Sequence, residues 1–265
     1  METERAISKL DVEAYLERLN YSGPIRPDID TLRELHRAHM LAVPFENLDI
    51  HLGQAIALDQ GALFDKIVTR RRGGFCYELN GLFCALLSGL GFKVTMLSAG
   101  VVTKDGSFGP EFDHMTLMVE LEERWLADVG FGDSFIEPLR LDEEGEQAQY
   151  GSAYRIAQDG HQRKMLRSDD ESSWADQYLF TLLPRRMDDY LEMCHYHQTS
   201  PDSHFTRQTV CSLATPEGRI SVSGKRLIVT KNRERQESLL EGEAEYAAVL
   251  RERFGVEVDV KKLLS

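Results

Sequence analysis

Residues 71–90 join a glycine pair and a single cysteine to a long apolar stripe. Between positions 79 and 90 the apolar side chains recur at the spacing of one helical face, at Leu79, Leu82, Phe83, Leu86, Leu87 and Leu90. Such a stripe is stable only when it is buried, so the pattern predicts a helix at the centre of a core. Cys76 then lies on or beside the first turn of that helix, just after Gly73 and Gly74.

This position favours chemistry at the Cys76 thiol. Unpaired amides and the positive end of the helix dipole stabilise a thiolate, which lowers a thiol pKa that is otherwise near about 8.5. The glycines permit a sharp turn and leave N–H groups free to bind an oxyanion. The alternative is a buried structural cysteine, a common fate of a single Cys.

Composition narrows the class of protein. A chain of 265 residues with 42% hydrophobic and 28% charged residues is ordinary for a globular protein, and a formal charge of −13 argues against nucleic acid or an anionic membrane as the main partner. The sequence contains no run of 18 apolar residues, and its first residues are not a basic segment followed by an apolar one. We therefore expect no membrane span and a cytoplasmic location. The four cysteines, at 76, 84, 194 and 211, form no Cys-x-x-Cys pair and are expected to be reduced.

The patterns divide the chain into an α+β succession. Helical periodicity dominates the first third of the chain. One helix is expected to begin at Thr31, where Thr31 and Glu34 have the spacing of a capping box. From position 93, β-branched and alternating segments predict an antiparallel sheet or small barrel. A short helix beginning at Pro184, a polar histidine-rich linker, further strands and a helix over 241–254 follow. We therefore expect a helical domain at 1–92, a β-barrel domain at 93–183, a linker at 184–204 and an α/β lid at 205–265.

His114 and Asp128 are candidates for the base and the orienting acid that a thiol nucleophile requires. His114 opens the predicted strand 115–121, and Asp128 closes the next strand, 124–129. If the two strands form a hairpin, His114 and Asp128 meet at one end of it, where the Cys76 helix could approach. The other reading is a loop histidine and a turn-forming aspartate. His36 and His39 have a metal-like spacing but no third ligand, so no metal site is predicted.

Several segments together resemble the arylamine N-acetyltransferase family. They are Arg72-Gly-Gly-Phe-Cys-Tyr-Glu-Leu-Asn80, Pro44-Phe-Glu-Asn47, Asp128-Val-Gly-Phe-Gly132 and Thr199-Ser-Pro-Asp-Ser-His-Phe-Thr206, with His114 between them. The resemblance covers almost the whole chain. It implies Cys76 as nucleophile, His114 as base and Asp128 as orienting acid, arranged as in papain-like cysteine enzymes within a helical domain, a β-barrel and an α/β lid.

The resemblance also implies an activity. Acetyl-coenzyme A would be the donor, and arylamines, arylhydrazines or arylhydroxylamines the acceptors, in a ping-pong cycle through an acetyl-cysteine. Phe45, Phe131 and Phe205 match aromatic positions near the family's thiol, and amides near Cys76 and in the 104–110 loop are candidate oxyanion donors. Three alternatives remain: an amide synthase, a thiol hydrolase or amidase, and a silent ligand-binding relative. The sequence leaves open whether the protein is a monomer or a homodimer.

Overall fold

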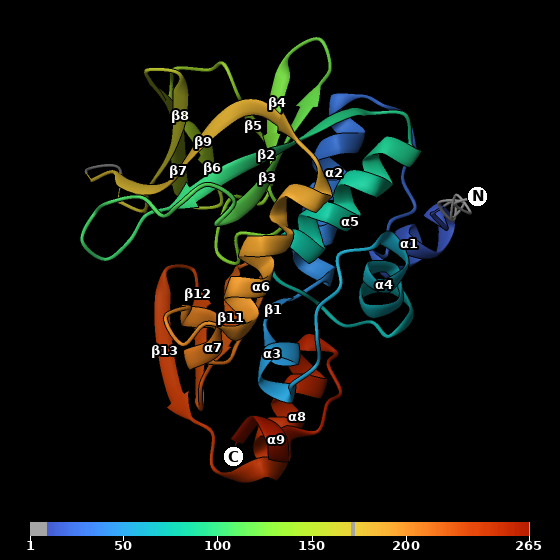
Figure 1. The fold of residues 1–265 in the computed structure, drawn as a ribbon, viewed down its shortest axis with the longest axis vertical. Coiled ribbons are helices and arrows are strands. Elements are labelled where there is room, and N and C mark those ends of the chain that lie inside the picture. The colour runs from blue at the N-terminus through green and yellow to red at the C-terminus, as the bar shows by residue number, and fades with distance from the viewer. Residues whose placement is uncertain (1–9, 171–172, 265) are drawn as a thin grey trace.

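Two antiparallel sheets and a set of helices make up the structure (Figure 1). The computed structural model describes residues 10–170 and 173–264. Helices of the first third pack against an eight-stranded sheet, and a five-stranded sheet with the C-terminal helices lies at the other end of the molecule. This arrangement confirms the α+β class predicted from the sequence.

Helices precede, connect and follow the sheets. Their bounds are α1 Val12–Arg18, α2 Ile29–Ala42, α3 Leu48–Leu52, α4 Gln60–Phe64, the π-helix η1 Asp65–Thr69, α5 Cys76–Gly89, the 3-10 helix η2 Met187–Tyr190, α6 Leu191–Thr199, α7 His204–Arg207, α8 Gly242–Phe254 and α9 Val260–Leu264. Helix α5 is the helix predicted from the apolar stripe, and Leu79, Leu82 and Leu86 on it are fully buried.

The larger sheet has the order β5-β4-β3-β2-β9-β8-β7-β6. Its strands are β2 Lys93–Val101, β3 His114–Glu120, β4 Arg124–Ala127, β5 Leu139–Arg140, β6 Gln147–Gln149, β7 Ser152–Asp159, β8 Gln162–Ser168 and β9 Ala175–Arg185. β3 and β4 are antiparallel neighbours, with Leu117 opposite Ala127. The predicted hairpin therefore exists, and it brings the start of β3 beside the end of β4.

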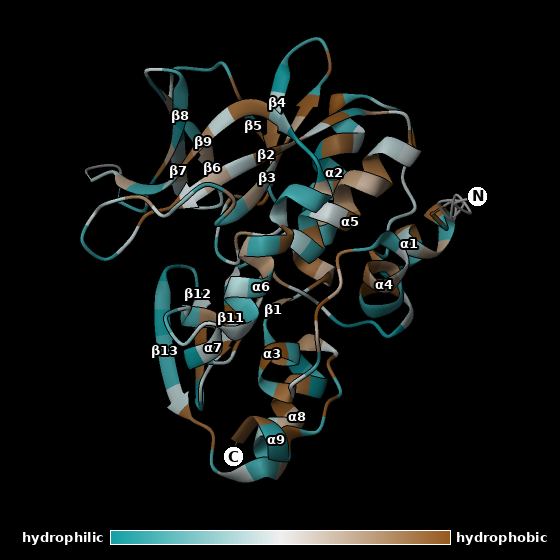
Figure 2. Ribbon diagram, in the orientation of Figure 1, coloured by the Kyte–Doolittle hydropathy of each residue, from teal (hydrophilic) through white to brown (hydrophobic). Residues whose placement is uncertain are grey.

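The smaller sheet has the order β1-β10-β11-β12-β13. Its strands are β1 Phe45–Glu46, β10 Val210–Thr215, β11 Gly218–Ser223, β12 Arg226–Lys231 and β13 Glu234–Leu239. Strand β13 is exposed along its length and largely teal in Figure 2, as expected of a charged edge strand.

Strand β1 joins the smaller sheet to the segment before Cys76. Phe45 pairs with Ser212 on β10 and also bridges Gly74, whose carbonyl accepts the Glu46 N–H at 2.8 Å. A Cβ at Gly73 would lie 1.9 Å from the Pro44 carbonyl oxygen, so only glycine permits this approach. A two-residue strand is too short to show alternation, so the sequence does not predict β1.

Two local predictions are wrong. Asp28, not Thr31, caps α2, because its Oδ1 accepts the Thr31 N–H at 2.9 Å and the helix therefore begins at Ile29. Pro184 lies within β9, near a register shift on the neighbouring strand β2 that tolerates a residue without an N–H. In the polar, histidine-rich stretch that follows, α6 continues to Thr199.

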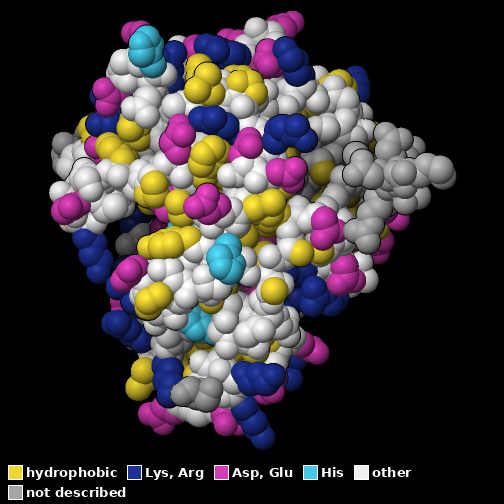
Figure 3. All heavy atoms as spheres, viewed as in Figure 1, with side chains coloured by type: hydrophobic (Ala, Val, Ile, Leu, Met, Phe, Trp, Pro, Cys, Tyr) yellow, Lys and Arg dark blue, Asp and Glu magenta, His cyan; other side chains and the backbone are white. Residues whose placement is uncertain are grey.

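The surface carries mixed charge. On the face shown in Figure 3, Lys and Arg side chains are interspersed with Asp and Glu. Within residues 10–170 and 173–264, no helix combines the length and the apolar character needed to cross a bilayer.

Candidate active site

Cys76 is the first residue of α5 and is 3% exposed. Glu78, two residues later, turns back so that its Oε2 accepts the Phe75 N–H at 3.1 Å. Its other oxygen, Oε1, lies 2.8 Å from Lys66 Nζ. These contacts fix the turn that carries the thiol, as a capping interaction does at a helix start.

A buried ionic cluster supports this turn from behind. We use that name for Glu46, Asp49, Lys66, Arg72 and Glu78. Lys66 contacts Asp49 at 2.8 Å as well as Glu78, and Arg72 contacts Glu46 at 2.7 Å and Asp49 at 2.8 Å. All five side chains are buried. The cluster therefore connects β1, α3, the π-helix η1 and α5 around the nucleophile.

His114 and Asp128 meet at the end of the β3–β4 hairpin. His114 Nε2 lies 2.7 Å from Asp128 Oδ2, and both side chains are buried. Burial alone would raise the pKa of Asp128, but His114, Asn80 and the Gly130 amide together hold it below its usual value. An ionised Asp128 accepts the Nε2–H of His114, which leaves Nδ1 of His114 available as a base.

Asn80 joins α5 to this pair, a role that local sequence patterns do not predict. Its Nδ2 donates to Asp128 Oδ1 at 2.9 Å and to the Met115 carbonyl at 2.6 Å, while its Oδ1 accepts the Val129 N–H at 2.9 Å. Asn80 lies four residues after Cys76, on the same side of the helix. Its place in the motif was visible in the sequence, but its partners were not.

Gly130 lets the acid-bearing loop approach the nucleophile. A Cβ at Gly130 would lie 2.8 Å from the Cys76 Cα and 2.7 Å from Asn80 Nδ2. Atoms that close would force the loop and the helix apart. Gly130 therefore sets the distance between helix α5, which begins at Cys76, and the loop that carries Asp128.

His36 is a buried support for Asp128 rather than a metal ligand. Its Nε2 accepts the Asp128 backbone N–H at 3.0 Å, and its Nδ1 donates to the Ile136 carbonyl at 2.8 Å. Burial lowers the pKa of His36 to about 4, so the ring is neutral at physiological pH. Across the described part of the chain, no group of three or more His, Cys, Asp or Glu side chains is arranged to hold a metal ion.

The expectation of a lowered pKa for the free Cys76 thiol is wrong. Burial raises the pKa of this thiol well above its usual value, and the Met115 amide opposes that effect only in part. Asp113 and Asp128 add negative charge nearby, which raises the pKa of Cys76 further. Burial and the nearby carboxylates therefore disfavour a thiolate without a cationic partner at this site.

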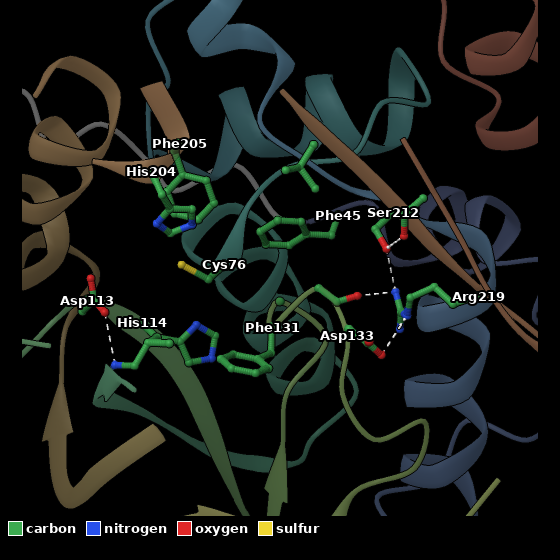
Figure 4. A pocket seen from close by; sticks show the side chains of 15 residues that line it. Phe45, Cys76, Asp113, His114, Phe131, Asp133, His204, Phe205, Ser212 and Arg219 are labelled. Carbon is green, nitrogen blue, oxygen red and sulfur yellow. Dashed lines mark hydrogen bonds and ion pairs between the residues drawn. The ribbon is translucent and has the colours of Figure 1, made fainter. Parts of the chain in front are cut away.

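A cavity of about 350 Å³ opens onto Cys76 and His114. Phe45, Phe131 and Phe205, the predicted substrate contacts, all line it. In Figure 4 the sulfur of Cys76 and the ring of His114 lie on one side, with Phe45 and Phe131 toward the middle. Val101 also lines the cavity, whereas the 104–110 loop, a candidate source of oxyanion donors, does not.

A cysteine and a histidine that line an aromatic cavity, with a buried aspartate bound to the histidine, are typical of an enzyme that works through a thiol nucleophile. Comparisons narrow this class. The family model described as N-acetyltransferase matches residues 28–263. An arylamine N-acetyltransferase from Gallus gallus is 33% identical over 95% of this chain and 96% of its own, and one from Escherichia coli K12 is 36% identical over 94% and 89%.

Solved structures agree with the sequence relatives. Arylamine N-acetyltransferase from Salmonella typhimurium superposes with a TM-score of 0.90 at 31% identity, covering 95% of this chain and 96% of its own. The Mycobacterium marinum enzyme in complex with CoA gives a TM-score of 0.89 at 32% identity, covering 96% and 97%. The chain belongs to the arylamine N-acetyltransferase family and is an acyltransferase. The family resemblance found in the sequence is confirmed.

Proposed function

We propose that this enzyme transfers the acetyl group of acetyl-coenzyme A to aromatic amines, arylhydrazines and arylhydroxylamines through an acetyl thioester on Cys76. The observation that carries the proposal is that Cys76 and His114 line one cavity walled by Phe45 and Phe131, while the buried Asp128 contacts His114 at 2.7 Å. The relatives named arylamine N-acetyltransferase, and the Mycobacterium marinum relative solved with CoA, support the same substrates.

The first half-reaction begins with a proton transfer from Cys76 to His114. Because burial opposes a lone thiolate, the charged sulfur forms together with an imidazolium whose other nitrogen faces Asp128. The sulfur attacks the acetyl carbon, a new C–S bond forms and the bond to coenzyme A breaks. His114 returns the proton to the departing thiolate of coenzyme A.

The second half-reaction uses the same atoms. The amine nitrogen attacks the acetyl carbon on Cys76, and His114 takes the proton that the nitrogen loses. The C–S bond then breaks and releases the amide product and the Cys76–His114 pair. Asp128 stabilises the imidazolium in both halves.

Mass spectrometry of the intact protein after mixing with acetyl-coenzyme A tests this assignment. We expect one acetyl adduct, located on Cys76 by peptide mapping and lost on addition of an arylamine. Cys84→Ser, which changes another buried cysteine of α5, should still form the adduct, whereas Cys76→Ser should not. An adduct that decays equally fast without amine would identify a hydrolase instead.

We further propose a cytoplasmic enzyme that is a monomer or a homodimer. The four cysteines are free thiols in the structure, which suits a reducing compartment. Fractionation of the source cells and light scattering of the purified chain test the two statements.

A further inference from the structure

The end of the cavity away from the thiol is polar and is formed by the smaller sheet. Arg219 and Ser221 on β11, Ser212 on β10 and Asp133 after β4 line it. In Figure 4, Arg219, Ser212 and Asp133 lie on the opposite side of the view from Cys76, with Phe45 and Phe131 between the two groups. An aromatic acceptor whose amine reaches Cys76 would direct its far substituent toward this polar end.

Alternation along β10 and β11 presents these side chains to the cavity. Cys211 and Val222 point into the core formed with α8, so their neighbours Ser212 and Ser221 point to the other face. Ser212 is paired with Ser221, and their hydroxyl oxygens lie 2.7 Å apart. The polar character of this face is therefore a property of the sheet rather than of one side chain.

Arg219 is held in place by several contacts. Its Nε donates to Asp133 Oδ1 at 3.0 Å, and its Nη1 donates to the Gly132 carbonyl and to Ser212 Oγ, the latter at 3.0 Å. Among the residues that the structure describes, none accepts a hydrogen bond from Nη2. The guanidinium is thus oriented by three partners and keeps one nitrogen for a further acceptor.

Arg219 lies in a cluster of two arginines and two aspartates, in which Arg167 also contacts Asp169 at 2.7 Å. Asp133 is shared, because Arg167 Nη1 also lies 3.1 Å from Asp133 Oδ1. Burial lowers the pKa of Arg219 and Arg167 lowers it further, while Asp133 opposes both effects. A largely covered guanidinium that keeps one nitrogen for a further acceptor can bind an added anion through a charge-assisted hydrogen bond.

We infer that Arg219 determines acceptor specificity by binding an anionic group, such as a carboxylate, at the ring position opposite the reacting amine. This inference rests on the proposed function of the same cavity and adds the class of acceptor that it prefers. A carboxylate would accept from Nη2 of Arg219, with the Ser221 hydroxyl in reach of the same end of the cavity. Neutral acceptors would occupy the aromatic part without this contact.

The experiment compares 4-aminobenzoate with 4-methylaniline, a neutral amine of similar shape, using acetyl-coenzyme A as donor. The preference is the ratio of their kcat/KM values, and the change in that ratio between variants cancels the intrinsic reactivity of each amine. The variants are Arg219→Gln, Arg219→Lys and Arg226→Gln. Arg226 is the matched control, because it is an exposed arginine of the next strand that does not line the cavity.

Loss of a charge-assisted hydrogen bond predicts that Arg219→Gln lowers the preference for 4-aminobenzoate by about 10- to 100-fold. We expect Arg219→Gln to lower kcat/KM more for 4-aminobenzoate than for 4-methylaniline, Arg219→Lys to keep part of the preference, and Arg226→Gln to behave as wild type. Benzoate should inhibit the wild type competitively against 4-methylaniline but inhibit Arg219→Gln weakly.

Three results would overturn the inference. An equal loss with both amines would mean that Arg219 only maintains the shape of the cavity. A raised KM for acetyl-coenzyme A with an unchanged amine preference would mean that Arg219 binds a phosphate of the donor. An unchanged preference in Arg219→Gln would mean that no anion binds there. A wild-type protein that acetylates neither amine would instead contradict the proposed function.

Discussion

Asn80 Nδ2 lies 2.9 Å from Asp128 Oδ1, so the helix that begins with the nucleophile also holds the acid that orients the base. The two oxygens of Asp128 are divided between tasks. Oδ1 accepts from Asn80 and from the Gly130 N–H at 3.1 Å, and Oδ2 contacts His114. The rotation of the carboxylate is thereby fixed, and the orientation of His114 relative to Cys76 follows from it.

Asn80→Ala should weaken both the fold and the nucleophile. It leaves Asp128 Oδ1 and the Met115 carbonyl short of a donor, at an expected loss of about 1–3 kcal/mol in the free energy of unfolding. It should also slow alkylation of Cys76 by iodoacetamide. Asn47→Ala is the matched control, because Asn47 is equally buried but bonds Phe205 and Val210. Equal alkylation rates in the two variants would show that Asn80 has only a structural role.

Asp128→Asn should leave a folded but poorly active enzyme. The amide can donate to His114 and favour the wrong tautomer, and the analogous change in a serine triad lowers the rate about 10⁴-fold. Alkylation of Cys76 should slow as well. Asp142→Asn serves as control, since Asp142 pairs with Arg124 at the other end of β4 and does not line the cavity. If iodoacetamide modified Cys76 at the wild-type rate in Asp128→Asn between about pH 5 and pH 8, Asp128 would not be the orienting acid.

Initial-rate kinetics should show a double displacement. Donor and acceptor use the same thiol in turn, so plots of acetyl-coenzyme A against an arylamine such as an anisidine should give parallel lines. Intersecting lines, together with failure to isolate an acetyl-enzyme, would indicate direct transfer between substrates bound at the same time. Cys76 would then be a packing residue.

The buried neutral His36 predicts an acid-sensitive fold. Its pKa is lowered from 6.5 to about 4, so between these values the unfolded chain binds a proton that the folded chain does not. Stability contributed by His36 is therefore present above about pH 6.5 and falls as the pH drops, by about 2 kcal/mol near pH 5.

Urea unfolding at pH 7 and pH 5 measures this effect. His36→Gln should reduce the difference in unfolding free energy between the two pH values, and His161→Gln, at an exposed position, should not. A pH dependence identical in His36→Gln and wild type would assign the acid sensitivity to other groups. His39, whose pKa is also lowered well below its usual value by burial, is the first of these.

Much of this arrangement could be predicted from local patterns. The apolar spacing identified α5, and two strands joined by a short turn were enough to place His114 beside Asp128. The contacts that could not be predicted are long-range. Strand β1 has no periodicity of its own and exists because it pairs with β10, about 165 residues later in the chain.

The pKa of Cys76 shows a second limit of the sequence. A helix start predicts a stabilised thiolate, but the burial that opposes it depends on which elements close over the thiol. The polar end of the cavity was missed for a related reason. Arg219 is held at the cavity by Asp133 and Ser212, which lie on another strand or loop. Nothing near Arg219 in the sequence indicates an active site.

The buried ionic cluster limits which substitutions this sequence can accept during evolution. Removing one of its partners leaves another charge buried without compensation, a loss of about 3–5 kcal/mol, which is a large part of the stability of an ordinary domain. Single replacements at positions 46, 49, 66, 72 and 78 are therefore poor intermediates between functional sequences. Across lineages that descend from a common ancestor of this protein, we expect these five charges to be inherited together or exchanged in compensating pairs.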